Sequence, residues 1–425
     1  MERKIEEFYH KLKNDIIRKP LILYGAKQIG KSFSVLEFGK KEYKNTVYFN
    51  TDNNPAIKEL FQKERSTERI ILNLSLISGE TILKEDTLII MDNLVDNEIA
   101  RGLKLFGSEH SKYHIIAITS KKEKLNDFKG EELQFKGMNS MDFEEFLWAK
   151  DEKSLAQLIR ESFTKRKTCP FHKVALDLFQ EYIETGGFPE VIAASLSGKT
   201  SFELDTIKQK IIDVYKKEVA LNSNLIDIPR GLEVLDSIPS QLKKDNKKFQ
   251  YGLMGLGKRA KEYESTINYI INNQLAYRSY KIKTVKSPLS SCKELDSFKL
   301  YAPDEGLLYS CLHLNNKQLL LDENIKEVIY ENHIARTLVE SGFALYYYQS
   351  DGKAEVNFVI QNRSGIIIPI ELITKTNSKA KSLSVFMKKF TVRQAYRITE
   401  NNFSTKKDIR YIPIYATFCL NETKI

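Results

Sequence analysis

The sequence predicts an α/β fold that begins with a parallel sheet flanked by helices. Three observations support this prediction. First, the apolar stretch LILY at residues 21–24 leads into a glycine-containing loop and then into a helical pattern. Second, the stretches DTLIIMDN (86–93) and YHIIAITS (113–120) are rich in Ile and Leu, as strands buried on both faces of a parallel sheet are. Third, amphipathic helical patterns replace the strands from residue 139 onwards.

The size and composition of the chain indicate a folded protein of several domains. Its 425 residues are too many for one hydrophobic core, because such cores stop growing at roughly 250 to 300 residues. Hydrophobic residues make up 42% and charged residues 29% of the chain. These values are those of ordinary globular proteins and exclude a disordered or fibrous chain. We therefore expect about two to four domains.

The sequence predicts a cytoplasmic protein that does not enter a membrane. Its first residues, MERKIEEFYHKLK, alternate charged and apolar side chains and lack the unbroken apolar stretch of a signal peptide. No segment approaches the roughly 18 uncharged apolar residues that are needed to span a bilayer. The four cysteines are far apart and fit neither zinc-ligand spacing nor a disulfide framework. We expect reduced thiols at Cys169, Cys292, Cys311 and Cys419.

The excess of positive charge predicts an anionic partner such as DNA. The formal net charge is +10, and clustered Lys and Arg side chains release counterions when they meet phosphates. The basic clusters concentrate in the middle of the chain, in KRK (165–167), KKDNKK (243–248), GKRAK (257–261) and KIKTVK (281–286). Each cluster can equally be a solvated helix face or loop, so both interpretations stay open.

The loop after the first strand has the pattern of a nucleotide-binding phosphate loop. GAKQIGKS matches G-x-x-x-x-G-K-S and lies between a strand and a helix, which is the context that supports this motif. Gly25 and Gly30 let the loop curl, so that successive backbone N–H groups and the N-terminal end of the helix face the phosphates. Lys31 is expected to reach the β and γ phosphates of ATP, and Ser32 to offer its hydroxyl to Mg²⁺. The predicted nucleotide-binding residues are Gly25, Ala26, Lys27, Gln28, Ile29, Gly30, Lys31, Ser32 and Phe33.

The ends of two expected strands carry candidate catalytic residues. Asp92 ends the stretch DTLIIMDN, where a carboxylate can hold the water shell of the Mg²⁺ on Ser32. Thr119 and Ser120 end YHIIAITS, and their hydroxyls serve either as a γ-phosphate sensor or as simple turn formers. TVYFN (46–50) is a further expected strand, and RIILNL (69–74) is a short apolar stretch.

Asn93 follows Asp92 at the position where related ATPases place a glutamate. That glutamate polarises the attacking water, and an amide cannot accept the proton at neutral pH, so hydrolysis is expected to be slow. Asp96 can substitute if residues 92–97 begin a helical turn, because it then lies one turn beyond Asn93 on a similar face. Alternatively, Asp96 is an ordinary solvated turn residue. We expect tight Mg-ATP binding with weak or partner-dependent turnover.

Several motifs along the chain together resemble one protein family. In chain order they are GAKQIGKS, MDFEEFL, TGGFPEVI, IPSQLKKDNKKFQY, FKLYAPDEGLL, YENHIARTL, KAEVNFVI and IPIEL. The sequence resembles prokaryotic AAA-type ATPases in which a P-loop core is fused to a C-terminal domain of unknown function, with a winged-helix-like part and a restriction-endonuclease-like part. The resemblance implies four parts: an AAA-type P-loop core at 1–137, a helical lid at 138–228, a winged-helix-like domain at 229–310 and a degenerate restriction-endonuclease-like α/β domain at 311–425.

The residues of the middle region support the winged-helix interpretation. EVLDSIPSQL (233–242) and RAKEYESTINYIINNQLA (259–276) have the apolar spacing of amphipathic helices. YRSYKIKTV (277–285) and SFKLYAP (297–303) alternate like the two strands of a wing. The second helix presents basic candidates for DNA binding, namely Lys258, Arg259 and Lys261. Winged helices also bind proteins, so a protein partner stays an alternative to DNA.

The C-terminal part lacks groups that the implied nuclease fold uses. That fold places an Asp at the end of one strand and Glu-x-Lys on the next, so that two carboxylates bind Mg²⁺ and the lysine assists the reaction. Here Asn357 replaces the Asp, and Glu371 is retained while an isoleucine stands in place of the lysine. Glu355 and Lys375 share a face with these positions, but each is displaced by roughly 6 to 7 Å along its strand. Glu331 either completes an acidic cluster or pairs with a lysine, and the nuclease site is expected to be degenerate.

Three functional hypotheses follow. The first is an ATP-binding AAA-type protein whose C-terminal half binds nucleic acid, a protein partner or a second copy of itself according to the nucleotide state. The second is a scaffold or regulator in which ATP stabilises the fold without being hydrolysed. The third, a metal-dependent nuclease, is disfavoured by the missing catalytic groups.

Overall fold

The computed structural model describes most of the chain. The described stretches are residues 1–52, 54–107, 112–121, 130–220, 228–314, 322–350, 355–374 and 380–421. The chain divides into two compact units, Met1–Ser140 and Met141–Ile425. Each unit has its own sheet.

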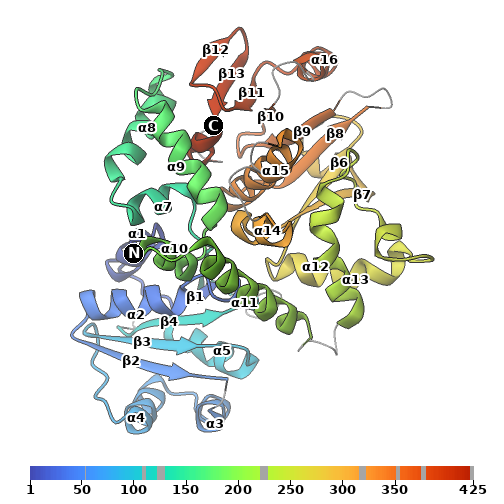
Figure 1. Cartoon of the computed structure of the whole chain (residues 1–425). Helices are drawn as coiled ribbons and strands as arrows, with labels where there is room; N and C mark the ends of the chain where they lie inside the picture. The colour runs from blue at the N-terminus through green and yellow to red at the C-terminus, as the bar shows by residue number, and fades with distance from the viewer. Residues whose placement is uncertain are drawn as a thin grey trace. The chain divides into compact units, whose positions relative to one another are not determined.

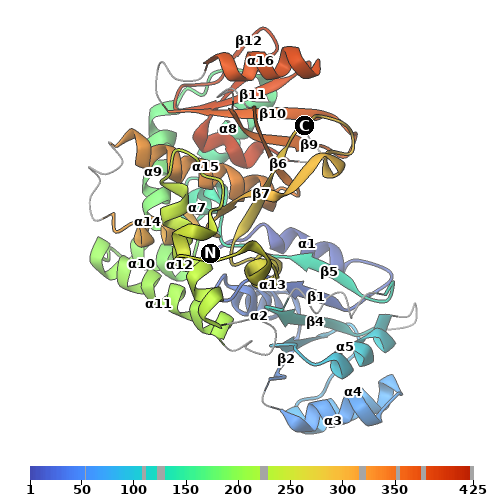
Figure 2. The same ribbon diagram turned by 90° about the vertical axis from the view of Figure 1, so that its right-hand side faces the viewer.

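The first unit is built around a five-stranded sheet with the order β2-β3-β4-β1-β5. Figure 1 labels β2, β3, β4 and β1 in this order, and Figure 2 labels β5. Its strands are β1 (Leu21–Tyr24), β2 (Asn45–Asn50), β3 (Thr87–Asp92), β4 (His114–Thr119) and β5 (Gln134–Gly137). All neighbouring strands run parallel. Every residue of β3 and β4 is buried, as their unbroken apolar sequences require. The predicted α/β fold with a parallel sheet is confirmed.

Helices connect these strands and complete the core of the first unit. They are α1 (Ile5–Lys13), α2 (Lys31–Glu42), α3 (Pro55–Lys63), α4 (Thr67–Ser78), α5 (Asn97–Leu103) and the 3-10 helix η1 (Lys104–Gly107). The apolar stretch at 69–74 lies in α4, where Ile70, Ile71 and Leu74 enter the core. The Ser66 side chain caps this helix by accepting a hydrogen bond from its first turn.

The second unit contains an eight-stranded mixed sheet with the order β12-β13-β11-β10-β9-β8-β6-β7. Its strands are β6 (Tyr277–Ile282), β7 (Lys293–Tyr301), β8 (Leu345–Gln349), β9 (Glu355–Gln361), β10 (Ile367–Ile373), β11 (Ala395–Thr399), β12 (Ser404–Lys406) and β13 (Ile409–Pro413). The pairs β6–β8, β10–β11 and β11–β13 are parallel, and the other pairs are antiparallel.

Helices precede, interrupt and follow this second sheet. They are α7 (Phe143–Ala149), α8 (Lys153–Lys165), α9 (His172–Thr185), α10 (Pro189–Leu196), α11 (Ser201–Ala220), α12 (Ile228–Leu242), η3 (Tyr251–Met254), α13 (Ala260–Asn272), η4 (Leu289–Cys292), α14 (Glu305–Cys311), α15 (Glu323–Glu340), α16 (Ala380–Phe390) and η6 (Ile414–Cys419). Asp142 caps α7 and forms a capping box with Glu145.

Helices α15 and α16 cover opposite faces of the second sheet (Figure 2). Asn357 of β9 donates a hydrogen bond to Glu331 of α15. The preceding residue, Val356, packs with Leu383 and Phe386 of α16. Because successive residues of a strand point to opposite faces, the two helices lie on either side of β9. Every residue of α15 from 328 to 338 is buried, which makes this helix part of the core.

The strands expected as a wing belong to this larger sheet. β6 and β7 pair antiparallel, as the wing requires. However, β6 also pairs in parallel with β8, which lies more than sixty positions further along the chain, at residues 345–349. The two expected helices exist as α12 and α13. The finer division into lid, winged-helix-like and nuclease-like parts stays a prediction.

Two further expectations concern membranes and thiols. Among the helices that the structure describes, none combines the length and the apolar character needed to cross a bilayer. All four cysteines are free thiols, as their spacing predicted. Burial raises the pKa of Cys311 to about 11, so this thiol stays protonated at neutral pH.

Candidate functional site

The loop between β1 and α2 has the backbone of an anion cradle. Gln28 and Gly30 adopt the left-handed conformation, with φ of 62° and 90°. These two turns curl the loop before α2 begins at Lys31. A Cβ on Gly25 would lie 2.2 Å from the carbonyl oxygen of Met138, so only glycine fits where β1 enters the loop.

The polar groups of this loop are arranged for a phosphate. Within the described residues, no protein acceptor takes the backbone N–H groups of Gln28, Gly30 or Ser32. The Lys31 ammonium lies over the loop and donates to the carbonyl oxygens of Gly25, at 2.9 Å, and Ala26, at 2.6 Å. Unpaired amides at a helix N-terminus and one ammonium together form a site for a polyanion. The predicted residues therefore fit the phosphates of a nucleotide.

Asp92 lies at the end of β3, and its carboxylate is held from two sides. Its Oδ2 accepts a hydrogen bond of 2.8 Å from the hydroxyl of Tyr48, and its Oδ1 accepts one of 2.8 Å from the amide of Asn93. Partial burial and the bond to Asp92 raise the pKa of Tyr48 to about 12, so the phenol stays protonated and is the donor. The carboxylate is thereby fixed in orientation, as a ligand of hydrated Mg²⁺ must be.

Thr119 lies between the phosphate loop and Asp92. It ends β4, which runs between β1 and β3, and it stands opposite Tyr24 in the register. Its carbonyl oxygen accepts a hydrogen bond of 3.3 Å from the amide of Gly25. Its hydroxyl accepts one of 3.0 Å from the amide of Lys121. The position suits a γ-phosphate sensor and the hydroxyl also shapes a turn, so both interpretations of Thr119 stay open.

Comparison with known proteins identifies this part of the chain. Residues 17–147 match the family model of an AAA domain. The first unit contains an AAA-type P-loop domain. Such a domain binds a nucleotide, usually with Mg²⁺. Residues 176–318 match a domain of unknown function (DUF8612), and residues 326–417 match another (DUF4143). No curated protein matches the chain.

Three of the solved structures that match the chain are distant likenesses. A Walker-type ATPase of Pyrococcus abyssi is 13% identical, with a TM-score of 0.43 and coverage of 72% of this chain and 94% of that one. The Hef helicase domain of Pyrococcus furiosus is 16% identical, with a TM-score of 0.18 and coverage of 67% and 81%. The Drosophila ORC bound to AT-rich DNA and Cdc6 is 10% identical, with a TM-score of 0.17 and coverage of 74% and 100%. At these scores, none of the three bears on the function of the chain.

Asn93 of the AAA domain has a backbone reason to be asparagine. Its φ is 58°, in the left-handed region, which asparagine adopts several-fold more readily than most residues. Its side-chain amide donates a hydrogen bond of 3.2 Å to the side-chain oxygen of Asn50. The residue that follows Asp92 is therefore shaped by the turn out of β3, which the sequence pattern did not reveal.

Asp96 is committed to structural contacts. Helix α5 begins at Asn97, so the helical turn expected at 92–97 does not form. Asp96 instead caps α5 by accepting a hydrogen bond of 2.8 Å from the amide of Glu98, and its Oδ2 lies 2.7 Å from the ammonium of Lys58. Partial burial acts to raise the pKa of Asp96, but the hydrogen bond from Lys58 lowers it. This arrangement favours the turn-residue interpretation, and a catalytic role for Asp96 stays a prediction.

Arg3 supports the phosphate loop from outside the matched domain. Arg3 is buried, with only 6% of the residue exposed. It donates hydrogen bonds to the carbonyl oxygens of Ile29, at 2.9 Å, and Asn139, at 2.7 Å. The α1 residue Tyr9 adds a hydrogen bond of 3.1 Å to Ser34 of α2. Sequence reasoning missed Arg3 because one arginine in a charged helical stretch gives no signal of its own.

The degenerate nuclease residues of the second unit occupy a buried ion-pair cluster. Asn357 donates a hydrogen bond of 3.1 Å to Glu331. Glu331 also accepts hydrogen bonds from the ammonium groups of Lys247, at 2.6 Å, and Lys299, at 3.0 Å. Burial acts to raise the pKa of Glu331, but the two ammonium groups hold it far below its usual value. Of the two expected roles for Glu331, pairing with lysine is the one that the structure shows.

Glu371, on the neighbouring strand β10, is also neutralised. Arg397 of β11 donates to its Oε2 from Nε at 2.9 Å and from Nη2 at 2.6 Å. The described residues hold no group of three His, Cys, Asp or Glu side chains that could bind a metal ion. Lys375 lies outside the described residues. A divalent cation would have to displace the protein's own cations, which supports the expectation of a degenerate site.

The predicted DNA-binding residues at the start of α13 stand on a face of mixed charge. Lys258 lies 3.0 Å from the carboxylate of Glu233. Arg259 and Lys261 are exposed, but the exposed Glu262 follows within the same turn. Contact between this face and DNA stays a prediction.

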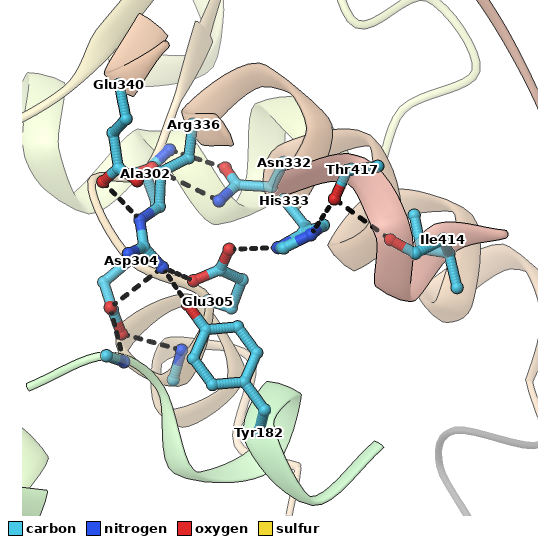
Figure 3. Close-up of polar contacts among 12 residues, drawn as sticks. Tyr182, Ala302, Asp304, Glu305, Asn332, His333, Arg336, Glu340, Ile414 and Thr417 are labelled. Carbon is cyan, nitrogen blue, oxygen red and sulfur yellow. Dashed lines mark hydrogen bonds and ion pairs between the residues drawn. The ribbon is translucent and has the colours of Figure 1, made fainter. Parts of the chain in front are cut away.

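Three motifs of the second unit meet in one buried polar network (Figure 3). Arg336, from YENHIARTL, forms ion pairs with Glu305 and with Glu340, the latter at 2.8 Å. His333 joins Glu305, at 2.6 Å, to Thr417, at 2.7 Å. Burial acts to raise the pKa of Glu305, but Arg336 and His333 lower it to about 2. The histidine is therefore a buried hydrogen-bonding partner within the core.

The glycine pair of TGGFPEVI is required by the same network. The amide of Gly187 donates a hydrogen bond of 2.9 Å to Asp304. Gly186 has φ of 79°, and a Cβ there would lie 2.3 Å from the Asp304 carboxylate. These motifs therefore hold α9, α14 and α15 together, and their role in this unit is structural.

Proposed function

We propose that this chain binds Mg-ATP through its AAA domain and hydrolyses it slowly, or only when a partner supplies the missing base. The observation that carries this proposal is the surroundings of Asp92. The residue after it, Asn93, is an amide in a left-handed turn, and the carboxylate expected to substitute, Asp96, is paired with Lys58. General-base catalysis needs a carboxylate or an imidazole within reach of the attacking water.

The binding half of the proposal rests on the phosphate loop. The amides of Gln28, Gly30 and Ser32 and the Lys31 ammonium would hold the β and γ phosphates, while Ser32 and Asp92 would hold Mg²⁺. ATP supplies the phosphoryl group when it is bound. We expect Lys31→Ala to weaken ATP binding at least about tenfold, because a charge-assisted contact is lost. Lys40→Ala, on the exposed side of α2, is the matched control. If calorimetry gives the same ATP affinity for wild type and Lys31→Ala, the proposal that the phosphate loop binds ATP is contradicted.

The turnover half is tested at Asn93. We expect Asn93→Glu to raise γ-phosphate release well above the wild-type rate, because it restores a carboxylate beside Asp92. Glutamate is disfavoured in the left-handed region, so this variant is also expected to lose about 1 kcal/mol of stability. Asn93→Gly is the control, since it tolerates the same backbone and offers no base. Hydrolysis by Asn93→Glu no faster than by Asn93→Gly, at equal ATP affinity, would count against the proposal.

The second unit is proposed to recognise a nucleic acid or a protein partner in a manner that depends on the nucleotide. The net charge of +10 supports an anionic partner. Measuring ATP hydrolysis with and without duplex DNA tests the coupling. Faster ATP hydrolysis in the presence of DNA supports the coupling. If the affinity for DNA is the same with and without ATP, DNA is not the nucleotide-dependent partner.

A non-hydrolysing scaffold is the second candidate. The pairing of Asp96 with Lys58 favours it, because an ammonium group then holds the carboxylate that was expected to replace the missing glutamate. A single-turnover measurement separates the two candidates. Slow release of labelled phosphate supports the ATPase, whereas intact ATP after prolonged incubation with DNA supports the scaffold.

A further inference from the structure

A small basic pocket lies at the edge of the second sheet, at the turn between β12 and β13. We call it the Arg410 pocket. Its volume is about 200 Å³. Its lining includes the cations Arg166, Arg393, Lys407 and Arg410, with Tyr396 and Thr405. Arg166 belongs to the basic cluster at 165–167 that the sequence singled out, and the other cations come from segments more than two hundred residues away.

The strand register brings the central groups of the pocket together. Arg410 of β13 stands opposite Thr405 of β12 and opposite Tyr396 of β11. Residues opposite each other on neighbouring strands point to the same face, so these three side chains form one row across the sheet. Gln394 donates a hydrogen bond of 2.8 Å to the Tyr396 hydroxyl, which fixes that end of the row.

Arg410 is held rigidly within the row. Its guanidinium carbon lies 3.9 Å from the centre of the Phe163 ring, and it donates a hydrogen bond to the Phe163 carbonyl oxygen. Its buried Nε has no hydrogen-bond partner in the described part of the chain. Burial lowers the pKa of Arg410, and the charge of the nearby Arg166 lowers it further. A fixed, incompletely paired guanidinium is what an anion site provides.

The pocket also carries more positive charge than the protein neutralises. Between the described residues, no ion pair involves Arg166, Arg393 or Lys407. Asp408 is the one acid among the lining residues. Elsewhere in the same unit, Lys299, Arg336 and Arg397 are all paired with carboxylates. Gathering four cations around one acid is unfavourable unless an external anion joins them.

We propose that the Arg410 pocket binds one phosphate group, either free or within a nucleic-acid backbone. Its volume lies below the roughly 300 to 1,000 Å³ of pockets for drug-sized ligands. Arginine forks and hydroxyl donors match phosphate oxygens in geometry and charge. The pocket is separate from the AAA nucleotide site and does not depend on it. If the phosphate belongs to DNA, the pocket is part of the surface that binds the anionic partner proposed above.

The test uses the full chain in a Lys31→Ala background, which removes the phosphate loop as a competing site. The double variant Arg393→Ala and Lys407→Ala is compared with Lys210→Ala, an exposed lysine of α11 outside the basic clusters of the sequence. Both substituted residues of the pocket are exposed, so the fold should persist, and circular dichroism checks it. Arg410 itself is left unchanged because it packs on Phe163.

Two ligands distinguish the source of the phosphate. Inorganic phosphate is titrated by calorimetry, and a labelled duplex of twenty base pairs is titrated by fluorescence anisotropy over a salt series. We expect the double variant to lose about tenfold or more in affinity for at least one ligand, with the salt slope for DNA reduced by about one. If the double variant loses affinity for DNA alone, the pocket binds a backbone phosphate. If it loses affinity for both ligands, the pocket binds phosphate groups generally. Unchanged affinities for both ligands, or an equal loss of affinity in Lys210→Ala, overturn the proposal.

Discussion

Side chains from outside the phosphate loop hold the nucleotide site of the AAA domain in place. Arg3 binds the loop carbonyl of Ile29, and Tyr48 orients Asp92. Each acts through a hydrogen bond to another group of the site. Such supporting contacts matter because a binding group displaced by about 1 Å loses much of its effect.

The contact between Arg3 and the loop can be tested directly. Arg3→Ala leaves the carbonyl oxygens of Ile29 and Asn139 without their buried donor, which typically costs about 1–3 kcal/mol. We expect lower stability and ATP affinity reduced by about fivefold or more, measured by calorimetry well below the melting temperature. Lys11→Ala, an exposed lysine of α1, is the control and should change neither quantity. An unaltered affinity in folded Arg3→Ala would show that the loop holds its shape unaided.

At the residue level, the sequence predicted groups that belong to a contiguous motif. Gly25, Gly30 and Lys31 follow from eight adjacent letters, and the structure brings them together. Arg3 and Tyr48 could not be predicted, because their partners lie on segments distant in the chain. The left-handed turn at Asn93 was also not predicted. In the sequence, this asparagine was considered only as the replacement of a catalytic glutamate, and not for the backbone conformation that it adopts.

At the scale of elements, the start of α5 favours the turn-residue interpretation of Asp96. As the cap of this helix and the partner of Lys58, Asp96 has a structural role that accounts for its position. Asp96→Ala should therefore cost about 1 kcal/mol, as the loss of a helix cap does. We expect the rate of ATP hydrolysis to stay within about twofold of wild type, because general-base loss typically costs 10² or more.

Urea unfolding and phosphate release on the same preparation test this prediction. Lys58→Met separates the ion pair from the cap, because it removes the former alone. A large fall in hydrolysis for Asp96→Ala at unchanged ATP affinity would make Asp96 the base and reverse the present assignment.

Elements with strong local patterns were predicted, whereas their pairing partners were not. β3, β4, α12 and α13 follow from apolar runs or helical spacing. The parallel pairing of β6 with β8 joins segments between which η4, β7, α14 and α15 lie in the chain. Alternation within a strand shows which face is buried but not which strand lies beside it. The expected wing was therefore recognised as a hairpin without its place in the larger sheet.

At the scale of the molecule, buried ion pairs connect distant segments of the second unit. The network around Arg336 joins helices α9, α14 and α15 with η6. The cluster around Glu331 joins α15 to β7 and β9. Breaking a buried pair from one side leaves an uncompensated charge in the core. These pairs therefore make the stability of the unit sensitive to protonation.

The pH dependence follows from Glu305. Its pKa is lowered from 4.5 to about 2 in the folded unit, so the folded state holds the proton less readily than the unfolded chain. The stabilisation is complete above the unfolded value and is lost as the pH falls from about 4.5 to 2. We expect about 3 kcal/mol of stability to be lost over this range through Glu305 alone. A stability that is constant down to pH 2 would contradict this assignment.

Trp148 allows this loss to be observed in the second unit alone. It is the single tryptophan of the chain and lies in α7. Its fluorescence during urea unfolding at a series of pH values reports on this unit. Glu264→Gln, at an exposed position, should leave the pH dependence unchanged.

The two ammonium groups beside Glu331 have one more consequence. Together they carry the same double positive charge as a divalent ion, but they are covalently attached to the chain. Lysine side chains, rather than a bound metal ion, therefore hold this part of the second unit together. It should keep its shape in a cell starved of magnesium, and a chelating agent should not loosen it.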